Sequence, residues 1–332
     1  MSGDALERAL AAPRQLTAGD VAACLSCADA GFEASLFAAA RAVKAACGRD
    51  AVLPRGLVEV SNVCAKDCLY CGIRKGNAAV SRYRLDADVV RACCAEAARR
   101  GYPAVAFQGG EIESEANTAF YEARLREIAA EGRLGEVTLS LGEQTEEVLR
   151  RWKAAAGGLV LRYLLRIETS NRTLYAKIHP ADCSFDRRLA CIRALKRLGY
   201  VTGSGVMIGL PGQTVEDLAR DVVFFADERL DMVGMGPFVP HAETPLGAAA
   251  IRAGLDAPAV RAATFRLALR MIAVTRLMLH DVNIVAATAL EAMDPDGREK
   301  GLAAGANVIM PNLTPADCRA RYTLYPGKVA AD

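Results

Sequence analysis

The chain has 332 residues, 24% of them charged, and a formal net charge of +2; this length suits one large α/β domain, and the balanced charge gives no general attraction to nucleic acid or an anionic membrane. No run of about 18 apolar residues is present, which argues against a membrane-spanning helix, and the start MSGDALERAL lacks the basic region of a signal peptide. Eleven cysteines without an export signal predict a cytoplasmic protein in a reducing compartment.

The first 50 residues are rich in alanine and predict two or three helices, including the run ERALAAPRQ. We expect a helical cap over 1–50 that belongs to the same domain as a barrel over 51–332. Several cysteines in mostly helical contexts are expected to be small buried apolar residues. They are Cys24, Cys27, Cys47, Cys93, Cys94, Cys183, Cys191 and Cys318.

A cysteine-rich loop follows the first predicted strand. Cys64, Cys68 and Cys71 form a C-x3-C-x2-C pattern in VEVSNVCAKDCLYCGIRKGN, and Tyr70 precedes the last cysteine. Cysteine thiolates hold iron–sulfur clusters, usually four to a cubane. Three close cysteines without an obvious fourth therefore predict a 4Fe–4S cluster with one open iron, which can chelate the amino and carboxylate groups of S-adenosylmethionine (SAM).

A zinc site and a disulfide are the alternatives for these cysteines. Zinc sites usually add a second cysteine pair or histidines, whereas His179, His241 and His280 are isolated in the sequence. A short-range disulfide in this run closes a strained loop and leaves one cysteine over. The pattern favours the cluster.

Short β-type runs alternate with amphipathic segments through the rest of the chain. The predicted strands are 56–61, 104–108, 136–141, 162–168, 201–208, 232–239, 283–289 and 306–311. The predicted helices between them are 86–100, 115–131, 144–156, 184–198, 214–229, 258–279 and 291–304. Strict alternation with apolar strands predicts a parallel sheet covered by helices. Eight such units in roughly 250 residues fit a closed (β/α)8 TIM barrel.

Polar and turn-forming residues follow the predicted strands, at the rim where barrels of this kind carry chemistry. They are Gln108, Gly109, Gly110, Glu111, Ser140, Gly142, Glu143, Arg166, Glu168, Thr169, Gly209, Pro211, Gly212, Pro240, His241, Thr288, Pro311 and Asn312. Each alone has a structural explanation, such as a glycine in a turn. Their shared position favours a functional site at this rim.

With these residues in place, the chain resembles the HydE family of radical-SAM maturases of FeFe hydrogenase over nearly its whole length. The matching runs are NVCAKDCLYCGIRKGN, SRYRL, LSLGE, RYLLRIET, GLPGQT, DMVGMGPFVPHAETPL, ANVIMPNLTP and YTLYPGK. Methylornithine synthases share the cysteine loop and the RYR run but resemble the later segments less well. Biotin synthases are more distant.

The resemblance implies a role for each matching residue. The three cysteines would bind the cluster, Glu168 would meet the SAM amino or ribose groups, and Arg188 would meet its carboxylate; these five form the implied catalytic set. The implied SAM side of the site is Tyr70 against the adenine together with Gln108, Gly109, Gly110, Glu111, Ser140, Met232 and Val239. The implied substrate end is Arg55, Ile167, Ala287, Thr288, Tyr322 and Tyr325. A zwitterionic cofactor requires one anion and one cation, which agrees with Glu168 and Arg188.

Several positions depart from the pattern of the resembled family. Ile167 stands where the family commonly has histidine, Gly109 where it has serine, and Ala287 where it has threonine. Each change removes a polar group from the rim or the substrate end. Glu291 replaces a glycine, and the accessory-cluster cysteines that some members carry after YPGK are not found before Asp332.

The resemblance implies an enzyme that reductively cleaves SAM to a 5′-deoxyadenosyl radical. The radical would act on a small cysteine-ligated organometallic iron compound in assembly of the hydrogenase active site. Expected partners are this substrate, an electron donor such as ferredoxin or flavodoxin, and other hydrogenase maturases, without nucleic acid or membrane. The alternatives are a radical-SAM enzyme for another small molecule (an amino acid mutase, a methylornithine-synthase-like enzyme or an enzyme of a thiol metabolite) and a non-catalytic iron–sulfur or SAM-binding protein.

Overall fold

A nearly closed parallel sheet forms the centre of the protein in the computed structural model, which describes residues 16–27 and 29–328. The eight strands pair in the order β10-β1-β2-β3-β4-β5-β7-β9. They are β1 (Leu53–Ser61), β2 (Ala104–Gly109), β3 (Glu136–Ser140), β4 (Val160–Leu164), β5 (Val201–Ser204), β7 (Met232–Val233), β9 (Asn283–Ile284) and β10 (Val308–Ile309). A parallel bridge between Val285 and Val308 brings the two edges together. The predicted (β/α)8 barrel is confirmed.

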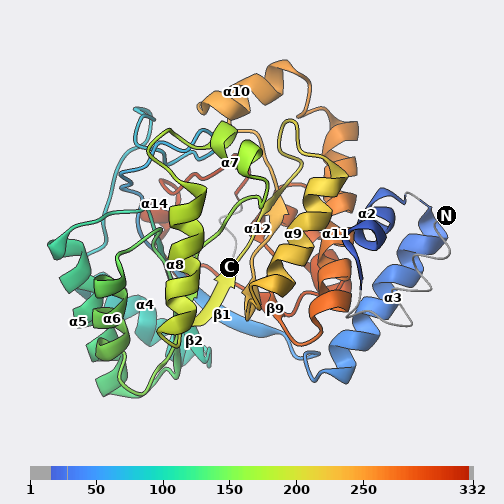
Figure 1. The fold of residues 1–332 in the computed structure, drawn as a ribbon. Helices are drawn as coiled ribbons and strands as arrows, with labels where there is room; N and C mark the ends of the chain where they lie inside the picture. The colour runs from blue at the N-terminus through green and yellow to red at the C-terminus, as the bar shows by residue number, and fades with distance from the viewer. Residues whose placement is uncertain (1–15, 28, 329–332) are drawn as a thin grey trace.

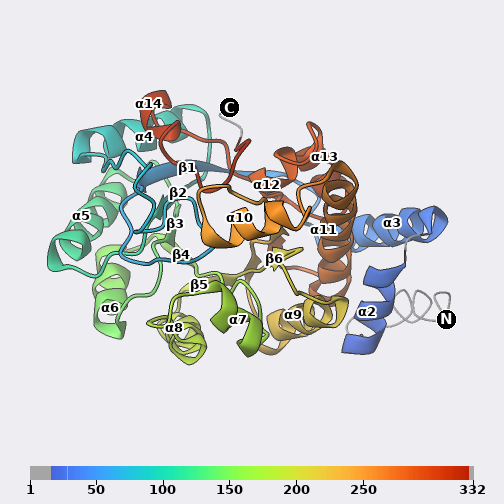
Figure 2. The same ribbon diagram turned by 90° about the horizontal axis from the view of Figure 1, so that it is seen from above.

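Helices surround the sheet on its outer side (Figure 1, Figure 2). Those that match the predicted segments are α4 (Ala87–Arg99), α5 (Glu115–Glu131), α6 (Glu146–Ala155), α8 (Phe185–Arg197), α9 (Val215–Asp227), α11 (Pro258–Leu279) and α13 (Gly297–Ala303). Side-chain caps explain where several begin: Ser184 accepts a hydrogen bond from the Arg187 amide, and Thr214 forms a capping box with Asp217.

Two predicted strands are wrong in their extent because each divides in two. Residues 201–208 contain β5 and β6 (Met207–Ile208), and residues 232–239 contain β7 and β8 (Gly236–Pro237); β6 and β8 form a separate parallel pair. The break lies at Gly205 and Gly234, where the backbones nearly touch. A Cβ on Gly205 would lie 1.9 Å from the Gly234 carbonyl oxygen, so a side chain there cannot be accommodated.

The predicted strand 283–289 and the predicted helix 291–304 also differ from the structure in their ends. The predicted strand 283–289 ends early because residues 288–291 form the short helix α12 (Thr288–Glu291), and α13 starts at Gly297 rather than 291. Three further short helices were not predicted: α7 (Arg172–Ile178), α10 (Pro245–Arg252) and α14 (Ala316–Arg319). Their few turns give too weak a hydrophobic period for a sequence pattern.

The N-terminal helices α2 (Ala18–Ser26) and α3 (Ala30–Ala46) pack along the outer flank of the barrel, against α9 and α11 (Figure 1, Figure 2). The buried Lys44 attaches α3 to the barrel by donating to the carbonyls of Leu302 (3.0 Å) and Ala306 (3.3 Å). The predicted run ERALAAPRQ lies outside the described residues. The division into a cap over 1–50 and a barrel over 51–332 stays a prediction.

Helix α10 lies across the middle of the upper end of the barrel, where the strands end (Figure 2). Its Leu246 amide donates to the Leu69 carbonyl of the cysteine loop at 2.9 Å. This helix therefore covers the rim on which the predicted site residues converge.

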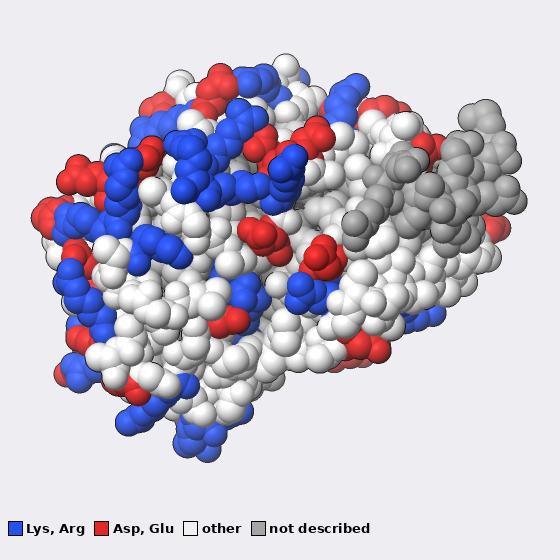
Figure 3. Space-filling model, turned by 60° about the horizontal axis from the view of Figure 1, so that its bottom comes forward, with Lys and Arg blue, Asp and Glu red and all other residues white. Residues whose placement is uncertain are grey.

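The charge of the surface follows the balanced composition. Acidic and basic side chains are mixed on the face in Figure 3, with one run of Lys and Arg along its upper part. Within the described ranges, no helix has both the length and the apolar character needed to cross a bilayer.

Candidate active site

The cysteine loop, residues 62–77, has no regular secondary structure and is held by hydrogen bonds instead. The Arg82 guanidinium donates to the carbonyls of Asn62 (2.6 Å), Ile73 (2.7 Å) and Arg74 (2.6 Å), and so ties the two ends of the loop together. The Ala65 amide donates to the Glu111 carbonyl at 2.8 Å. An irregular loop fixed in this way can present several thiols in a constant arrangement.

Backbone amides point at the first cysteine. The Cys64 sulfur accepts from the amides of Glu111 (3.3 Å) and Lys66 (3.4 Å). Hydrogen bonds to sulfur stabilise a thiolate that is bound to iron. Gly110 makes the approach possible, since a Cβ there would lie 2.2 Å from the Val63 carbonyl oxygen and 2.6 Å from Cys64 Cβ.

The thiols fit a cluster better than a single ion. Among the described residues, no group of three His, Cys, Asp or Glu side chains converges as the ligands of one metal ion do. The thiolates of a cubane bind separate irons and need not converge on one point. Burial raises the pKa of Cys64 and raises that of Cys71 to about 12, so iron must displace a proton from each thiol when it binds.

A fourth cysteine, Cys183, lies against the loop. The interaction of its thiol with that of Cys68 raises the pKa of Cys68 and lowers that of Cys183. Of the eight cysteines predicted to be buried apolar residues, five are buried, whereas Cys27, Cys47 and Cys183 are only partly so. Nothing in the sequence spacing places Cys183 near the loop, because it lies 112 positions after Cys71.

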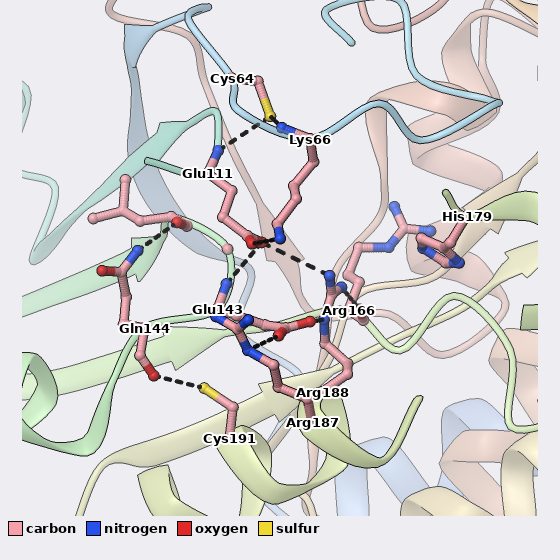
Figure 4. Close-up of polar contacts among 12 residues, drawn as sticks. Cys64, Lys66, Glu111, Glu143, Gln144, Arg166, His179, Arg187, Arg188 and Cys191 are labelled. Atoms are coloured by element: carbon pink, nitrogen blue, oxygen red, sulfur yellow. Dashed lines mark hydrogen bonds and ion pairs between the residues drawn. The ribbon is translucent and has the colours of Figure 1, made fainter. Parts of the chain in front are cut away.

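Buried charges surround the Arg188 side chain beside the cysteine loop (Figure 4). Its guanidinium donates to Glu143 (2.6 Å) and to the Arg166 carbonyl (2.7 Å), and its Nη2 lies 3.8 Å from Glu111 Oε2. The Lys66 ammonium lies 3.5 Å from the other oxygen of Glu111. Glu111 lies beyond hydrogen-bond distance of Arg188. The Arg188 guanidinium therefore keeps N–H donors that can bind an anionic ligand.

Glu168 has the features of a ligand-binding carboxylate. It is buried, and its φ of +65° is in the left-handed region, which costs a non-glycine residue on the order of 1–3 kcal/mol. Its Oε2 lies 2.9 Å from Arg166 Nη2 but has no partner in hydrogen-bond geometry within the described residues. Burial raises its pKa. The contact with Arg166 offsets only part of that burial cost, and a ligand that donates a hydrogen bond to this oxygen would offset more of it.

Two glycines shape the same rim. Gly142 has a φ of +76°, and a Cβ there would lie 2.3 Å from Glu111 Oε2. Gly109 is less restricted, because its nearest neighbours, Leu141 and Tyr121, are 3.4 Å from the position of a Cβ. The Glu143 amide donates to Glu111 Oε2 at 2.8 Å, so the tight turn at Gly142 fixes Glu111.

Tyr70 occupies an apolar corner of the rim. It packs against an apolar cluster that includes Phe238 and Met207, as does Leu246 of α10; Val239 is also buried and follows Phe238 in the sequence. Its hydroxyl is 3.2 Å from Nε2 of His179, a residue that sequence patterns did not select for the site. Gln108 and Ser140 lie side by side in the register of β2 and β3.

The predicted substrate-end residues fall into two groups. Thr288 and Tyr325 form one group, in which their hydroxyl oxygens are 2.5 Å apart, and Ala287 directly precedes Thr288 at the start of α12. Arg55 is in register with Ala104, the first residue of β2, and therefore lies toward the opposite end of the barrel.

The contacts of Arg55 are unusual for a buried cation. Its Nη1 lies 3.2 Å from the sulfur of Met232, for which the resemblance implied a place near the adenine. Burial lowers its pKa to about 10. Ile167 is fully buried in the main core, and its amide donates to Ser204 Oγ.

A buried ion pair joins the end of the described chain to the first strand, and sequence patterns did not predict it. Lys328 binds Glu59, which is 0% exposed and also accepts from Asn312 Nδ2 at 3.1 Å. The Lys328 ammonium lies 4.4 Å from the Tyr322 ring centre and donates to the Tyr322 carbonyl at 3.1 Å. The pair thus fixes the segment that carries Tyr322 and Tyr325.

Comparison with known proteins agrees with this geometry. The sequence model of the Radical SAM superfamily matches residues 58–225. The chain is 42% identical over 316 residues to the [FeFe] hydrogenase maturase subunit HydE of Thermotoga maritima, covering 95% of this chain and 86% of that protein. One similar solved structure is methylornithine synthase PylB, with a TM-score of 0.75 and 24% identity, covering 100% of this chain and 88% of that chain. Another is the maturase HydG, with a TM-score of 0.76 and 19% identity, covering 94% of this chain and 68% of that chain. These two structures support the fold alone.

Proposed function

Because the chain belongs to the HydE family of the radical SAM superfamily, we propose that it cleaves SAM reductively and acts on a small cysteine-ligated organometallic iron compound during maturation of FeFe hydrogenase. The single observation that carries this proposal is the buried carboxylate of Glu168, which lies in a left-handed turn at the rim of the barrel that also holds the three-cysteine loop. Its Oε2 is paired with Arg166 but has no partner in hydrogen-bond geometry among the described residues.

The cofactors of this family are a 4Fe–4S cluster and SAM. When bound, the reduced cluster supplies the electron that cleaves SAM to methionine and a 5′-deoxyadenosyl radical. Cys64, Cys68 and Cys71 hold the cluster in our proposal. Glu168 binds a cationic or hydroxyl group of SAM, and Arg188 binds its carboxylate.

The surrounding residues keep these groups in position and exclude water. Glu143 and the Arg166 carbonyl hold the Arg188 guanidinium in one orientation, which reduces the ordering cost when an anion binds. Helix α10 covers Tyr70 from above. An enclosed site protects a reactive intermediate from side reactions.

Partners and location follow from the same chemistry. We propose that a small acidic redox protein such as ferredoxin or flavodoxin supplies the electron, and that other hydrogenase maturases provide the substrate and accept the product. All eleven cysteines are free thiols. Free thiols and a reduced cluster both require a reducing compartment, for which we propose the cytoplasm.

The test is anaerobic loading with iron and sulfide, followed by reduction in the presence of SAM and a cysteine-ligated iron carbonyl cyanide. We expect release of 5′-deoxyadenosine together with consumption of the iron compound. Glu168→Gln should retain the cluster and lose most of both reactions, because a neutral amide binds a cation weakly. SAM binding by the reduced wild type without nucleoside release would identify a non-catalytic protein.

A second candidate is a related enzyme with another small substrate, favoured by Gly109, Ile167 and Ala287. Ile167→His is the matched variant, because it restores the side chain common in the family. If the iron compound is the substrate, the wild type consumes it in step with nucleoside release. Nucleoside release without consumption, in both wild type and Ile167→His, would favour the second candidate.

A further inference from the structure

The segment between α7 and α8, residues 178–184, runs against the cysteine loop and contacts it at successive positions. The Leu69 amide donates to the Ile178 carbonyl at 3.0 Å. The Tyr70 hydroxyl meets His179 at 3.2 Å, and Lys66 Nζ lies 3.7 Å from Asp182 Oδ2. These contacts fix the two segments relative to each other.

Cys68 and Cys183 lie within this contact, next to the Leu69–Ile178 and Lys66–Asp182 pairs, and each thiol alters the pKa of the other. A disulfide has an S–S bond of about 2.05 Å, so two thiols in contact need to approach on the order of 1–2 Å to form one. Both cysteines are partly exposed, and the neighbours Asp182 and Ser184 are exposed. A small oxidant can therefore reach the pair, and the short exposed segment can supply the movement.

Other thiols are arranged differently. Cys93 donates to the Leu313 carbonyl at 3.2 Å, and Cys191 to the Gln144 carbonyl at 3.6 Å; both are buried. Cys68 and Cys183 thus differ from them in having each other as partners at an accessible edge. Because a Cys68 thiolate bound to iron cannot also form a disulfide, the cluster and this disulfide exclude each other.

We propose that Cys183 is a resolving cysteine, which forms a reversible disulfide with Cys68 when the cluster-free protein meets a peroxide. Hydrogen peroxide oxidises one thiol to a sulfenic acid and leaves as water. The second thiol attacks that sulfur, an S–S bond forms, and a second water leaves; two thiols lose two electrons and two protons, and one peroxide is reduced to two waters. A dithiol then reduces the disulfide and returns Cys68 to the cluster site.

Without a neighbouring thiol, a sulfenic acid at Cys68 continues to the sulfinic acid, which dithiols do not reduce. Cys183 would thereby keep an essential iron ligand recoverable after oxidative loss of the cluster. The protective role of Cys183 rests on the proposed function, in which Cys68 is a cluster ligand. The disulfide itself does not, because it is tested on cluster-free protein without SAM.

The experiment treats the full, chelator-stripped and reduced chain with a few equivalents of hydrogen peroxide, alkylates the remaining thiols and digests with trypsin under non-reducing conditions. We expect a disulfide between peptides 67–74 and 178–187, with fragmentation assigning it to Cys68 and Cys183. After dithiothreitol, the treated wild type should recover most of its capacity to bind iron on reconstitution.

Two variants complete the test. Cys183→Ser should lack the linked peptide, contain sulfinic acid at Cys68 and recover severalfold less iron, while binding iron like the wild type before peroxide. Cys47→Ser, which removes a partly exposed thiol at the end of α3, should behave as the wild type. A wild-type disulfide between Cys68 and Cys64 or Cys71, full iron recovery by Cys183→Ser, or failure of untreated Cys183→Ser to bind iron would each overturn the proposal.

Discussion

At the scale of single residues, Arg188 is the sharpest test of the proposed SAM site. Arg188→Ala should weaken SAM binding on the order of 1.5–3 kcal/mol, because a charge-assisted contact to the carboxylate is lost. Equilibrium titration of SAM into the cluster-loaded protein measures this. Arg193→Ala, on the same helix, removes an exposed cation paired with Glu228 and should leave the affinity unchanged.

The variant also removes one of the two guanidinium partners of the buried Glu143, which keeps Arg187 at 3.1 Å, so folding has to be checked separately. Arg188→Ala combined with Glu143→Gln removes the carboxylate charge as well. If both variants bind SAM as tightly as the wild type, Arg188 does not contact the cofactor.

The sequence identified the residues whose spacing is local and missed those that the fold brings together. The cysteine loop is apparent from eight consecutive positions, Cys64 to Cys71, whereas Glu168 and Arg188 were assigned through the family resemblance. His179 and Cys183 reach the loop only through the packing of residues 178–184, and Lys328 reaches Glu59 across the whole barrel. Such contacts leave no periodic signal in one sequence.

At the scale of elements, α9 holds the turn that carries Glu168. Its Asp221 accepts from the Ser170 amide at 2.6 Å, two residues beyond Glu168. Burial raises the pKa of Asp221 to about 7 from an ordinary value of 3.8. Between these values the folded protein binds a proton that the unfolded chain releases, so this group lowers stability as the pH rises from 4 to 7.

Asp221→Asn should remove that contribution while keeping an oxygen that accepts from Ser170. In the wild type the unfolding free energy should fall between pH 5 and pH 8; in Asp221→Asn this fall should be smaller by about 2–3 kcal/mol. Urea unfolding of the reduced, cluster-free protein at both pH values measures the difference. Asp227→Asn, at the exposed end of the same helix, should keep the wild-type slope; an equal slope in Asp221→Asn would show that Asp221 does not titrate in this range.

Long elements were predictable and short ones were not. The predicted helix 115–131 matches α5, and 258–279 matches α11, because both are long and have clear end signals: Ser114 caps α5, Gly132 ends it, and Pro258 begins α11. Residues 201–208 have the composition of one strand, but the contact between Gly205 and Gly234 divides it. That contact forms only when the barrel brings residues 201–208 and 232–239 together, so neither segment predicts it alone.

At the scale of the whole molecule, the Glu59–Lys328 pair links the first strand to the end of the described chain. Lys328→Met leaves the fully buried Glu59 without its cation and should cost on the order of 3–5 kcal/mol of unfolding free energy. Combining it with Glu59→Gln should recover much of the loss, since no unpaired charge remains. Thermal or urea unfolding measures both.

A surface pair provides the contrast. Lys300 lies 2.7 Å from Asp294 and is 44% exposed, so Lys300→Met should change stability by less than about 1 kcal/mol. Equal effects of Lys300→Met and Lys328→Met would show that the buried pair does not hold the chain end in place.

The barrel as a whole was predictable because strand and helix alternate strictly, and its chemistry because the cysteine loop follows the first strand. The choice of substrate was not, because a single sequence does not show the shape of the space that a substrate occupies. The buried charges around Arg188 likewise come from separate parts of the chain: Glu111 follows β2, Glu143 follows β3 and Lys66 lies in the cysteine loop (Figure 4).

The most direct test of the account is to add SAM to the anaerobic, iron-loaded and chemically reduced protein while recording its electron paramagnetic resonance spectrum. We predict that SAM changes the signal of the reduced cluster and that 5′-deoxyadenosine accumulates, and that Cys68→Ala shows neither effect. A fully iron-loaded wild type whose spectrum is unchanged by SAM, and which releases no nucleoside, would contradict the account.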